Sequence, residues 1–520
     1  MYKIRIKNLR SLKDTKELEI KPLTIVVGRN SSGKSTLLRF FPLMKQTLET
    51  RRNEPILWYS NSYVDFGSFK EALNKKEVGK ENESMNFSIS FNMYRRDLNR
   101  IGRYLINDKN DKNEKLETMI SFNIKKDYIN NVNINIGKNN IEINFKNKIT
   151  VDYIVINGTN IADEKIKGYK SGHIRGILPD LVVFNEEDKI SNSIEEYFVE
   201  LICNRVKEKC NIDYYENFVG EFIEQFIEKI NIGSILNMET INAVDYTENN
   251  SDLIQEIVEL IKSDHIIQNY ILGSKLERIL YLCNMYLEEK FINVKYIAPV
   301  RANAERYYRV QGLAINEIDS RGENIAMLLY NLSDKNKKDF SSWVRENFGF
   351  GISTYSEGGH VSINVQHKDT GEPINLVDTG FGYSQILPII VQLWKITKER
   401  NLRSRYMLHN REIHILVIEQ PELHLHPAMQ ADLVDAFVKV LNLAKQHKID
   451  LRILIETHSE TIVNRVGYLI DEKRFGCSEE LVNLLIFNKV DEYESCIIKS
   501  GYDKNGYLEQ WPIGFFNAGE

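Results

Sequence analysis

Eight residues near the N-terminus have the types and the spacing of a loop that binds phosphate. The stretch Gly28–Ser35 reads Gly-Arg-Asn-Ser-Ser-Gly-Lys-Ser and fits the pattern G-x-x-x-x-G-K-[ST] in full. Its glycines allow backbone N–H groups to point inward around a phosphate chain, and a helix N-terminus adds positive charge there. Lys34 is expected to lie in a solvent-accessible loop and reach the β- and γ-phosphates, while Ser35 is expected to hold Mg²⁺. The predicted nucleotide-binding residues are Gly28, Arg29, Asn30, Ser31, Ser32, Gly33, Lys34, Ser35 and Thr36.

The elements that must position this loop can be recognised on both of its sides. Leu23–Val27 is a continuous apolar run typical of a buried strand, and Thr36–Phe40 has the pattern of the start of a helix. A strand, a loop and a helix in this order are the context that the motif requires. This context favours nucleotide binding over a chance match in a long chain.

Two further apolar runs, in the C-terminal half, are followed by acidic residues. The run Ile415–Ile418 leads into Glu419, which is the Walker B arrangement, in which a carboxylate at a strand end meets the Mg²⁺ shell. Residues 420–427 continue as Gln-Pro-Glu-Leu-His-Leu-His-Pro, and a helix is predicted after them. A second buried strand is predicted at Leu451–Ile455, and it runs into Glu456-Thr457-His458-Ser459.

The order of these three motifs resembles the ABC-type ATPase heads of the SMC/RecF and OLD (overcoming lysogenization defect) group. The resemblance covers residues 1–70 and 295–470, and Val377–Pro388 lies where such heads carry their signature loop, just before a helix. The stretch Trp511–Phe516 resembles the terminus of bacterial AAA-type or OLD-like ATPases, several of which belong to phage-defence systems. The implied fold class is α/β, an ABC-ATPase-type P-loop NTPase head with a mostly helical insertion.

The resemblance implies roles for individual residues. Glu419 stands at the position of the Walker B aspartate and would contact Mg²⁺, and His458 stands at the switch histidine that senses the γ-phosphate. The residues that would contact the γ-phosphate of a partner subunit's nucleotide are Gly380, Gly382, Ser384 and Gln385. Such a site closes only between two heads. The resemblance therefore implies ATP and Mg²⁺ as cofactors, and a homodimer or a higher oligomer of dimers.

Gln420 departs from the family pattern, because it occupies the position usually held by the catalytic glutamate. An amide cannot accept a proton, although it can orient water as glutamine does in some GTPases. Glu422 lies close enough in sequence to stand in, so turnover is expected to be slow. The segment Gly380–Gln385 also lacks the sequence L-S-G-G-Q, and no Mg²⁺-contacting glutamine is obvious after the P-loop helix. Asp65 is the best candidate for that Mg²⁺ contact.

Composition is typical of a cytoplasmic globular protein. The 520 residues suggest about two to four domains, and no run of about 18 apolar residues predicts a membrane span. The five cysteines show no C-x-x-C spacing, which is typical of reduced thiols. The net charge of −5 and the pI of about 6.2 exclude a global electrostatic attraction to nucleic acid.

Apolar periodicity divides the chain into three parts. Residues 1–160 are expected to form the N-terminal part of the head with a β-rich lobe, residues 161–290 a mostly helical insertion, and residues 291–520 the C-terminal part. Period-two alternation predicts strands at Phe87–Phe91, Val132–Ile136 and Ile141–Phe145. Helical spacing is found at Ile194–Val206, Phe218–Ile230 and Leu276–Leu287. The insertion would serve either packing or a dimer or partner surface.

The motifs of this sequence are compatible with three functions. The first is an ATP-driven dimeric switch or scaffold, the ATPase component of a bacterial defence system whose effector, a nuclease or toxin, is a separate chain. The second is a RecF-like ATPase of DNA repair or recombination that loads on DNA. The third is a GTP-dependent switch, because Asn488–Asp491 matches N-K-x-D after an apolar strand. No D-x-x-G follows a strand in the right place, so the sequence favours ATP over GTP.

Two other kinds of site are not expected. A Toprim nuclease needs a Glu and a D-x-D beyond the ATPase, and Asp491 and Asp503 form no such set, so no nuclease is expected in this chain. His424, His426 and His458 are expected to be structural or switch residues rather than zinc ligands, because no cysteine is near them.

Overall fold

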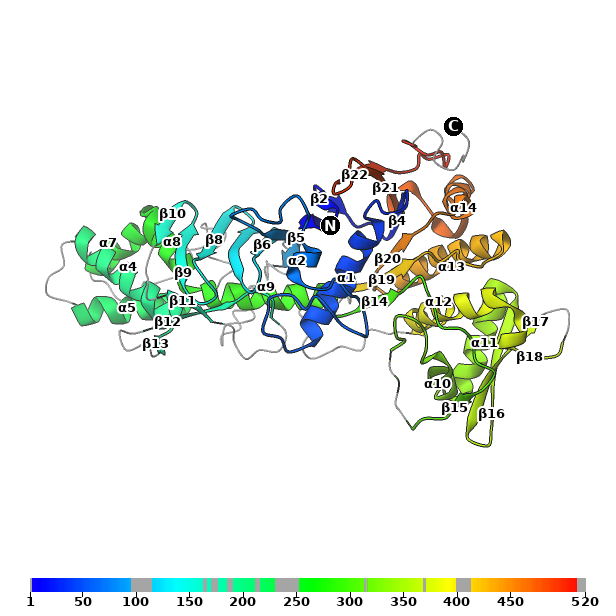
Figure 1. Ribbon diagram of the computed structural model, residues 1–520. Coiled ribbons are helices and arrows are strands. Elements are labelled where there is room, and N and C mark those ends of the chain that lie inside the picture. The colour runs from blue at the N-terminus through cyan, green and yellow to red at the C-terminus, as the bar shows by residue number, and fades with distance from the viewer. Residues whose placement is uncertain are drawn as a thin grey trace.

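The structure of the chain is a computed structural model that describes residues 2–94, 115–161, 166–169, 176–184, 190–210, 216–229, 252–312, 315, 317–367, 371–398 and 413–511. The fold is α/β, as the sequence predicts. A central parallel sheet lies between a long β-rich and helical part and a smaller lobe (Figure 1).

The central sheet brings both ends of the chain together. Its strand order is β14-β19-β20-β4-β21-β22, and neighbouring strands are parallel except β21 and β22. The strands are β4 (Leu23–Gly28), β14 (Val294–Ile297), β19 (Ile413–Glu419), β20 (Asp450–Glu456), β21 (Val482–Lys489) and β22 (Ser495–Ser500). Because the carboxyl ends of parallel strands share one edge, the P-loop after β4 meets the ends of β19 and β20.

Both faces of the central sheet are buried, as is usual for parallel strands. Along β19, Ile415 and Val417 belong to one hydrophobic core, while Leu416 and Ile418 belong to the other. The first core includes residues of α1 (Lys34–Glu49) and α9 (Leu276–Phe291). The second includes residues of α12 (Phe381–Lys398), α13 (Pro427–Gln446) and α14 (Glu460–Asp471). The run of apolar residues in each strand is explained by this double burial.

A nine-stranded antiparallel sheet adjoins the P-loop helix. Its order is β10-β9-β8-β7-β6-β5-β1-β2, and β3 pairs with β1. The strands are β1 (Lys3–Leu9), β2 (Leu12–Asp14), β3 (Leu18–Glu19), β5 (Met85–Tyr94), β6 (Lys115–Ile124), β7 (Ile129–Ile136), β8 (Asn139–Phe145), β9 (Val151–Ile156) and β10 (Thr159–Ile161). In β5, buried and partly exposed residues alternate along the whole strand. The three strands predicted by alternation are confirmed as parts of β5, β7 and β8.

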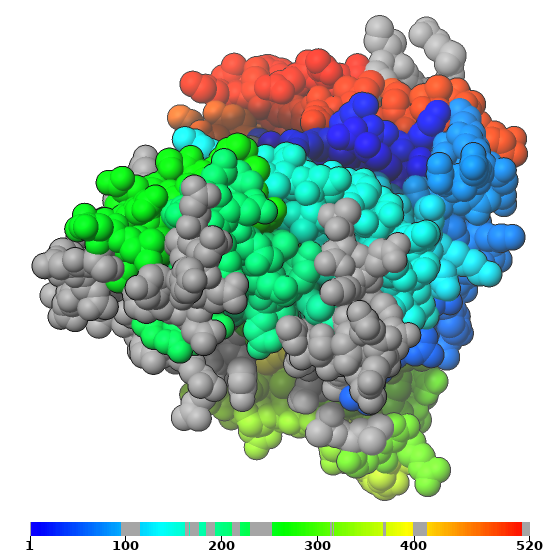
Figure 2. Space-filling model, turned by 90° about the vertical axis from the view of Figure 1, so that its left-hand side faces the viewer, coloured from blue at the N-terminus to red at the C-terminus, as the bar shows by residue number. Residues whose placement is uncertain are grey.

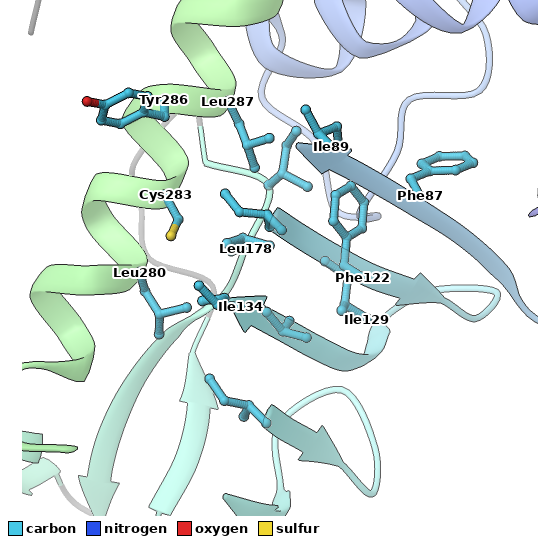
Figure 3. Close-up of a cluster of buried hydrophobic side chains, with 14 of the residues drawn as sticks. Phe87, Ile89, Phe122, Ile129, Ile134, Leu178, Leu280, Cys283, Tyr286 and Leu287 are labelled. Carbon is cyan, nitrogen blue, oxygen red and sulfur yellow. The ribbon is translucent and has the colours of Figure 1, made fainter. Parts of the chain in front are cut away.

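The apolar face of this sheet packs on helix α9. Leu280, Cys283 and Leu287 of α9 face strand residues such as Ile89 and Ile134 (Figure 3). All five side chains are fully buried. The sheet therefore has one face in the core and one polar face, which is the arrangement that period-two alternation predicts.

Helices and a small sheet extend this part of the molecule away from the P-loop. The elements are α4 (Ile194–Cys210), α5 (Glu216–Lys229), α7 (Asp252–Ser263), α8 (His265–Ser274) and the antiparallel strands β11 (Ile166–Tyr169), β12 (Asp180–Phe184) and β13 (Ile190–Asn192). The three helices predicted from apolar spacing are present as α4, α5 and α9, although Ile230 lies outside the described residues. The helices share the core of the antiparallel sheet, and the boundaries at residues 160 and 290 stay predictions.

The smaller lobe follows β14 and ends in helix α12. It contains β15 (Tyr308–Arg309), α10 (Ile325–Tyr330), α11 (Asp334–Phe348), β16 (Phe350–Glu357), β17 (His360–His367), β18 (Ile374–Asn375) and the 3-10 helix η2 (Leu376–Thr379). Short elements elsewhere are α2 (Phe69–Ala72), η3 (Arg474–Gly476) and η4 (Glu479–Leu481). Figure 2 shows the lobe in yellow-green below the rest, and the first residues of the chain in dark blue beside the red C-terminal strands.

Candidate functional site

The P-loop joins β4 to α1 at the shared edge of the central sheet, and two of its glycines are required by their surroundings. A Cβ atom on Gly28 would lie 2.6 Å from the carbonyl oxygen of Phe487 on the neighbouring strand β21. Gly33 has a φ of 89°, in the left-handed region that other residues rarely adopt, and its Cβ would lie 2.5 Å from Ser11 Oγ. Close backbone approach and a left-handed turn therefore fix the two glycines of the motif.

The start of helix α1 fits a phosphate group. The helix begins at Lys34 without a side-chain cap, so its first backbone N–H groups are not satisfied by the residue before it. Among the described residues, the buried Ser32 Oγ also has no hydrogen-bond partner. Uncapped helix N–H groups and an unpaired buried hydroxyl both gain hydrogen bonds when an anion binds. The loop is thus suited to the phosphates of a nucleotide.

Lys34 is buried, and the expectation of a solvent-accessible lysine is wrong. Its side chain is 3 % exposed, because it is the first residue of α1 and lies under the loop and the end of β20. Its Nζ donates hydrogen bonds to the carbonyl oxygens of Gly28 (3.0 Å) and Arg29 (2.8 Å) and lies 3.7 Å from Glu456 Oε1. Burial lowers the pKa of Lys34. The ammonium is held within reach of the loop in which a phosphate would lie.

Two carboxylates stand side by side where β19 and β20 end. Glu419 and Glu456 are register partners on these parallel strands, and both are buried. Glu456 Oε2 accepts a hydrogen bond of 2.7 Å from Ser35 Oγ. Burial, and then the neighbouring Glu419, raise the pKa of Glu456. The acid that touches Ser35 is therefore Glu456, to which the sequence pattern gave no role, although it follows a buried strand just as Glu419 does.

Glu419 is held by a cation and a phenol. Arg39, one turn after the P-loop on α1, donates to both oxygens of Glu419 at 2.8 and 2.9 Å. The hydroxyl of Tyr296 on β14 donates to Glu419 Oε1 at 2.7 Å. This hydrogen-bonded pairing raises the pKa of Arg39. The predicted contact of Glu419 with Mg²⁺ stays a prediction, and the structure adds Arg39 and Tyr296 as residues that orient this carboxylate.

A tight turn after β19 places Glu422 next to the end of β20. Gln420 has a φ of 46°, and its backbone N–H donates to the carbonyl oxygen of Glu456. Glu422 Oε1 accepts a hydrogen bond of 2.7 Å from the backbone N–H of His458. Its second oxygen is buried and has no partner among the described residues. Burial raises the pKa of Glu422, so this carboxylate is a stronger base than an exposed glutamate.

His458 lies close to the P-loop lysine. Burial lowers the pKa of His458, and the positive charge of Lys34 lowers it further. The structure therefore brings together the predicted residues Lys34, Ser35, Glu422 and His458. A neutral imidazole beside the ammonium can respond to a γ-phosphate by hydrogen bonding.

Arg301 holds the turn at Gln420 through hydrogen bonds to its backbone. No role was predicted for Arg301 from the sequence. It follows β14, is 3 % exposed, and donates from Nη2 to the carbonyl oxygens of Glu419 (2.9 Å) and Gln420 (3.3 Å). Burial lowers the pKa of Arg301 to about 10. The sequence signal that could have found it is an arginine four residues after the end of an apolar strand.

The signature-like segment lies at the start of α12, and only its first residues are exposed. Gly380 has a φ of 90°, and a Cβ atom on it would meet no atom within 4 Å. Phe381 is 60 % exposed, whereas Ser384 and Gln385 are buried, and Ser384 Oγ donates to the carbonyl oxygen of Phe381. A Cβ atom on Gly382 would lie 2.9 Å from the carbonyl oxygen of His424. A second subunit could reach Gly380 and Phe381 directly, but not the two buried polar side chains.

Two other predicted acidic residues are engaged elsewhere. Asp65 is exposed, and its Oδ1 accepts a hydrogen bond of 2.7 Å from the backbone N–H of Gly67 in its own loop. Asp491 of the N-K-x-D stretch lies 2.5 Å from Lys76 Nζ, which also contacts Glu494. In the described part of the chain, neither carboxylate forms a hydrogen bond or ion pair with Lys34, Ser35 or Glu456, and the metal role of Asp65 stays a prediction.

A metal at this site would have to share its ligands with the nucleotide. Within the described residues, no group of three or more His, Cys, Asp and Glu side chains is placed to hold a metal ion. Mg²⁺ is commonly bound by one or two protein ligands together with substrate phosphates. Ser35 with a neighbouring carboxylate fits this pattern.

No helix in the described parts of the chain combines the length and apolar character needed to cross a membrane.

Comparisons with known proteins agree with the motifs. Residues 1–463 match the model of a protein family described as AAA ATPase domain. None of the curated proteins compared with the chain matches it in sequence.

Similar solved structures include head domains of Smc proteins. One, from Pyrococcus furiosus with an extended coiled coil and bound to the C-terminal domain of ScpA, is 11% identical, with 96% of each chain covered and a TM-score of 0.34. The SMC head domain from Thermotoga maritima is 8% identical, with 95% of this chain and 97% of that chain covered and a TM-score of 0.33.

Proposed function

Because the chain belongs to the AAA ATPase domain family, we propose that it is an ATP-binding and ATP-hydrolysing dimeric switch, the ATPase component of a bacterial defence system that acts with a separate effector such as a nuclease or toxin. One observation carries the ATPase part. Lys34 and Ser35 at the start of α1 meet Glu456 at the end of β20, while Glu422 keeps one buried oxygen free of partners among the described residues.

Binding of ATP would use groups that are already in place. Phosphate oxygens would accept hydrogen bonds from the first N–H groups of α1 and from Ser32 Oγ. Lys34 would exchange the carbonyl oxygens of Gly28 and Arg29 for the β- and γ-phosphates. Mg²⁺ would neutralise charge on the phosphates, and Ser35 lies where the motif places its metal ligand.

Glu422 would act as the general base. Its free oxygen and raised pKa suit it to accept a proton from water, which the amide of Gln420 cannot do. Gln420 is held in a left-handed backbone conformation by the turn. The base would thus come from three residues beyond the end of β19, and the slow turnover expected from Gln420 stays a prediction.

The dimer is supported by an exposed apolar edge at the signature-like segment. Phe381 at the start of α12 is 60 % exposed, and Val377 on η2 is 40 % exposed. The ion pair between Arg306 and Asp378 places Tyr307, which is 61 % exposed, beside the same edge. Large apolar side chains gathered at one edge favour contact with another protein surface. We propose that this surface is the nucleotide-bound P-loop face of a second copy.

Replacement of Phe381 by glutamate should weaken ATP-dependent dimerisation. Burying a phenylalanine contributes about 1.5–3 kcal/mol, so the loss should raise the dimer dissociation constant by about tenfold or more. Mass measurement by light scattering with ATP, on a background that cannot hydrolyse it, would show this. ATP affinity of the monomer should be unchanged, because Phe381 is exposed at the start of α12 and its ring packs against His424 rather than being part of the P-loop.

Val78→Glu is the matched control, because Val78 is an exposed apolar residue in another loop. It should dimerise like the unmodified chain. Equal dimerisation of Phe381→Glu and Val78→Glu would exclude the edge at Phe381 as the contact.

The purified chain alone should not cut DNA with Mg²⁺ or Mn²⁺. Asp503 accepts hydrogen bonds from the backbone N–H groups of Asn505 and Tyr507, and Asp491 is paired with Lys76, so these acids form no paired-carboxylate site. Incubation with plasmid and linear DNA would test this. Cleavage that disappears in Asp491→Asn or Asp503→Asn would overturn the separate-effector proposal.

Copurification tests whether the chain binds a separate effector protein. An effector that remains bound through ion exchange, identified by mass spectrometry with and without ATP, is the expected result. DNA binding that weakens steeply with salt, without a copurifying effector, would instead support a RecF-like repair ATPase.

A further inference from the structure

The two neighbouring carboxylates of the site differ in the kind of cation that balances each of them. Glu419 is held by Arg39 through two hydrogen bonds, and a guanidinium in this geometry is a fixed, permanently charged partner. Glu456 is balanced by Lys34, whose Nζ lies 3.7 Å away, and by the hydroxyl of Ser35. Lys34 and Ser35 are also the two residues that the P-loop motif assigns to the nucleotide and its metal.

Nucleotide binding therefore changes the surroundings of Glu456 and leaves those of Glu419 alone. When the phosphates take up Lys34, Glu456 loses the cation that forms an ion pair with it, and only the charge of Arg39, which is paired with Glu419, remains nearby. A buried carboxylate without a counter-charge is costly, and Glu456 is only 3 % exposed. Glu419 is a second negative charge beside it, which increases the need for a cation. Glu419 would keep its hydrogen bonds from Arg39 and Tyr296, which the P-loop motif does not assign to the nucleotide.

We propose that Glu456, rather than Glu419, is the carboxylate that holds the Mg²⁺ of bound ATP, together with Ser35. This inference rests on the proposed ATPase function. Ser35 Oγ and Glu456 Oε2 are 2.7 Å apart, so the two oxygens already converge on one place. Both are hard oxygen ligands, and one carboxylate with one hydroxyl leaves the remaining positions to phosphates and water, as Mg²⁺ prefers. Glu419 is then a positioning residue that fixes Arg39 on α1.

A second possible role for Glu456 predicts a different effect of its loss on ATP binding. Glu456 could serve only as a stand-in for phosphate, occupying Lys34 and Ser35 until ATP displaces it. In that case its loss would strengthen ATP binding to the same extent with and without Mg²⁺. As a metal ligand, its loss would weaken binding only when Mg²⁺ is present.

The test compares ATP affinity in Mg²⁺ with ATP affinity in EDTA for the full chain and for Glu456→Gln and Glu419→Gln. The Mg²⁺-dependent gain in affinity should fall by about tenfold or more in Glu456→Gln, since even outer partners of metal ligands affect affinity by about 10–100-fold. In Glu419→Gln the gain should stay within about threefold, while the melting temperature falls because Arg39 loses a buried partner. Glu456→Asp, which keeps the charge, should retain part of the gain.

A second readout does not depend on affinity. The electron paramagnetic resonance spectrum of Mn²⁺ bound with ATP should change in Glu456→Gln and match the unmodified chain in Glu419→Gln. An unaltered Mg²⁺-dependent gain in Glu456→Gln, with its loss in Glu419→Gln, would overturn the proposal. The proposal would also be overturned if Glu456→Gln bound ATP more tightly than the unmodified chain by the same factor in Mg²⁺ and in EDTA. Failure of the unmodified chain to bind ATP at all would refute the proposed function itself, and is seen before any variant is compared.

Discussion

Replacement of Lys34 by alanine is expected to abolish ATP binding at concentrations that saturate the unmodified chain. The ammonium would make charge-assisted hydrogen bonds to the β- and γ-phosphates, and two such bonds at about 1.5–3 kcal/mol each correspond to an affinity loss of roughly 100-fold or more. Titration with a fluorescent ATP analogue measures the loss directly. The folded chain should persist with a lower melting temperature, because alanine fits a helix start, whereas the buried Glu456 loses its counter-charge and keeps the hydrogen bond from Ser35.

Lys45→Ala is the matched control for this variant. Lys45 lies on the same helix, is 1 % exposed, and pairs with Glu317 as Lys34 pairs with Glu456. Its loss should lower the melting temperature and leave ATP affinity nearly unchanged. If Lys34→Ala and Lys45→Ala bind ATP equally well, the loop Gly28–Ser35 is not the nucleotide site.

Glu422→Gln should lower the rate of ATP hydrolysis by about 100-fold or more while ATP binding stays nearly normal, because a general base typically contributes 10²–10⁴-fold to the rate. The amide keeps the hydrogen bond from the backbone N–H of His458 and so preserves the turn. Only the capacity to accept a proton is removed. Single-turnover hydrolysis with bound ATP separates this effect from binding and product release.

The pH dependence of hydrolysis gives the same residue a second test. A base works only when it is unprotonated, so the rate should fall as pH decreases through the pKa of Glu422. Burial raises that pKa, so the fall should begin at higher pH than for an ordinary glutamate, and Glu422→Gln should lack it. Asp435→Asn is the control, since Asp435 on α13 is a buried carboxylate held by Arg465 of α14. Hydrolysis that is insensitive to Glu422→Gln would assign the base to another group.

Features set by neighbours in sequence could be predicted from the sequence itself. The P-loop is such a feature, because Gly28, Gly33, Lys34 and Ser35 owe their roles to a fixed spacing within one strand–loop–helix unit. Strands such as β5 and β7 follow from alternation, since a half-buried strand repeats every two residues. Glu419 and Glu456 could each be recognised as an acid at the end of a buried strand.

The roles of those two acids were decided by the tertiary structure. Sequence order does not show that β20 lies between β19 and β4, and this order places Glu456, not Glu419, against Ser35. Nor does it show that Arg39 on α1 reaches Glu419, or that Arg301 donates to the turn at Gln420, because these pairs are 380 and 119 residues apart in the sequence. Strand order and helix packing depend on long-range contacts within the two hydrophobic cores. The sequence by itself therefore determined which chemistry the chain carries, and the packing of the sheet determined which carboxylate stands beside the phosphate-binding loop.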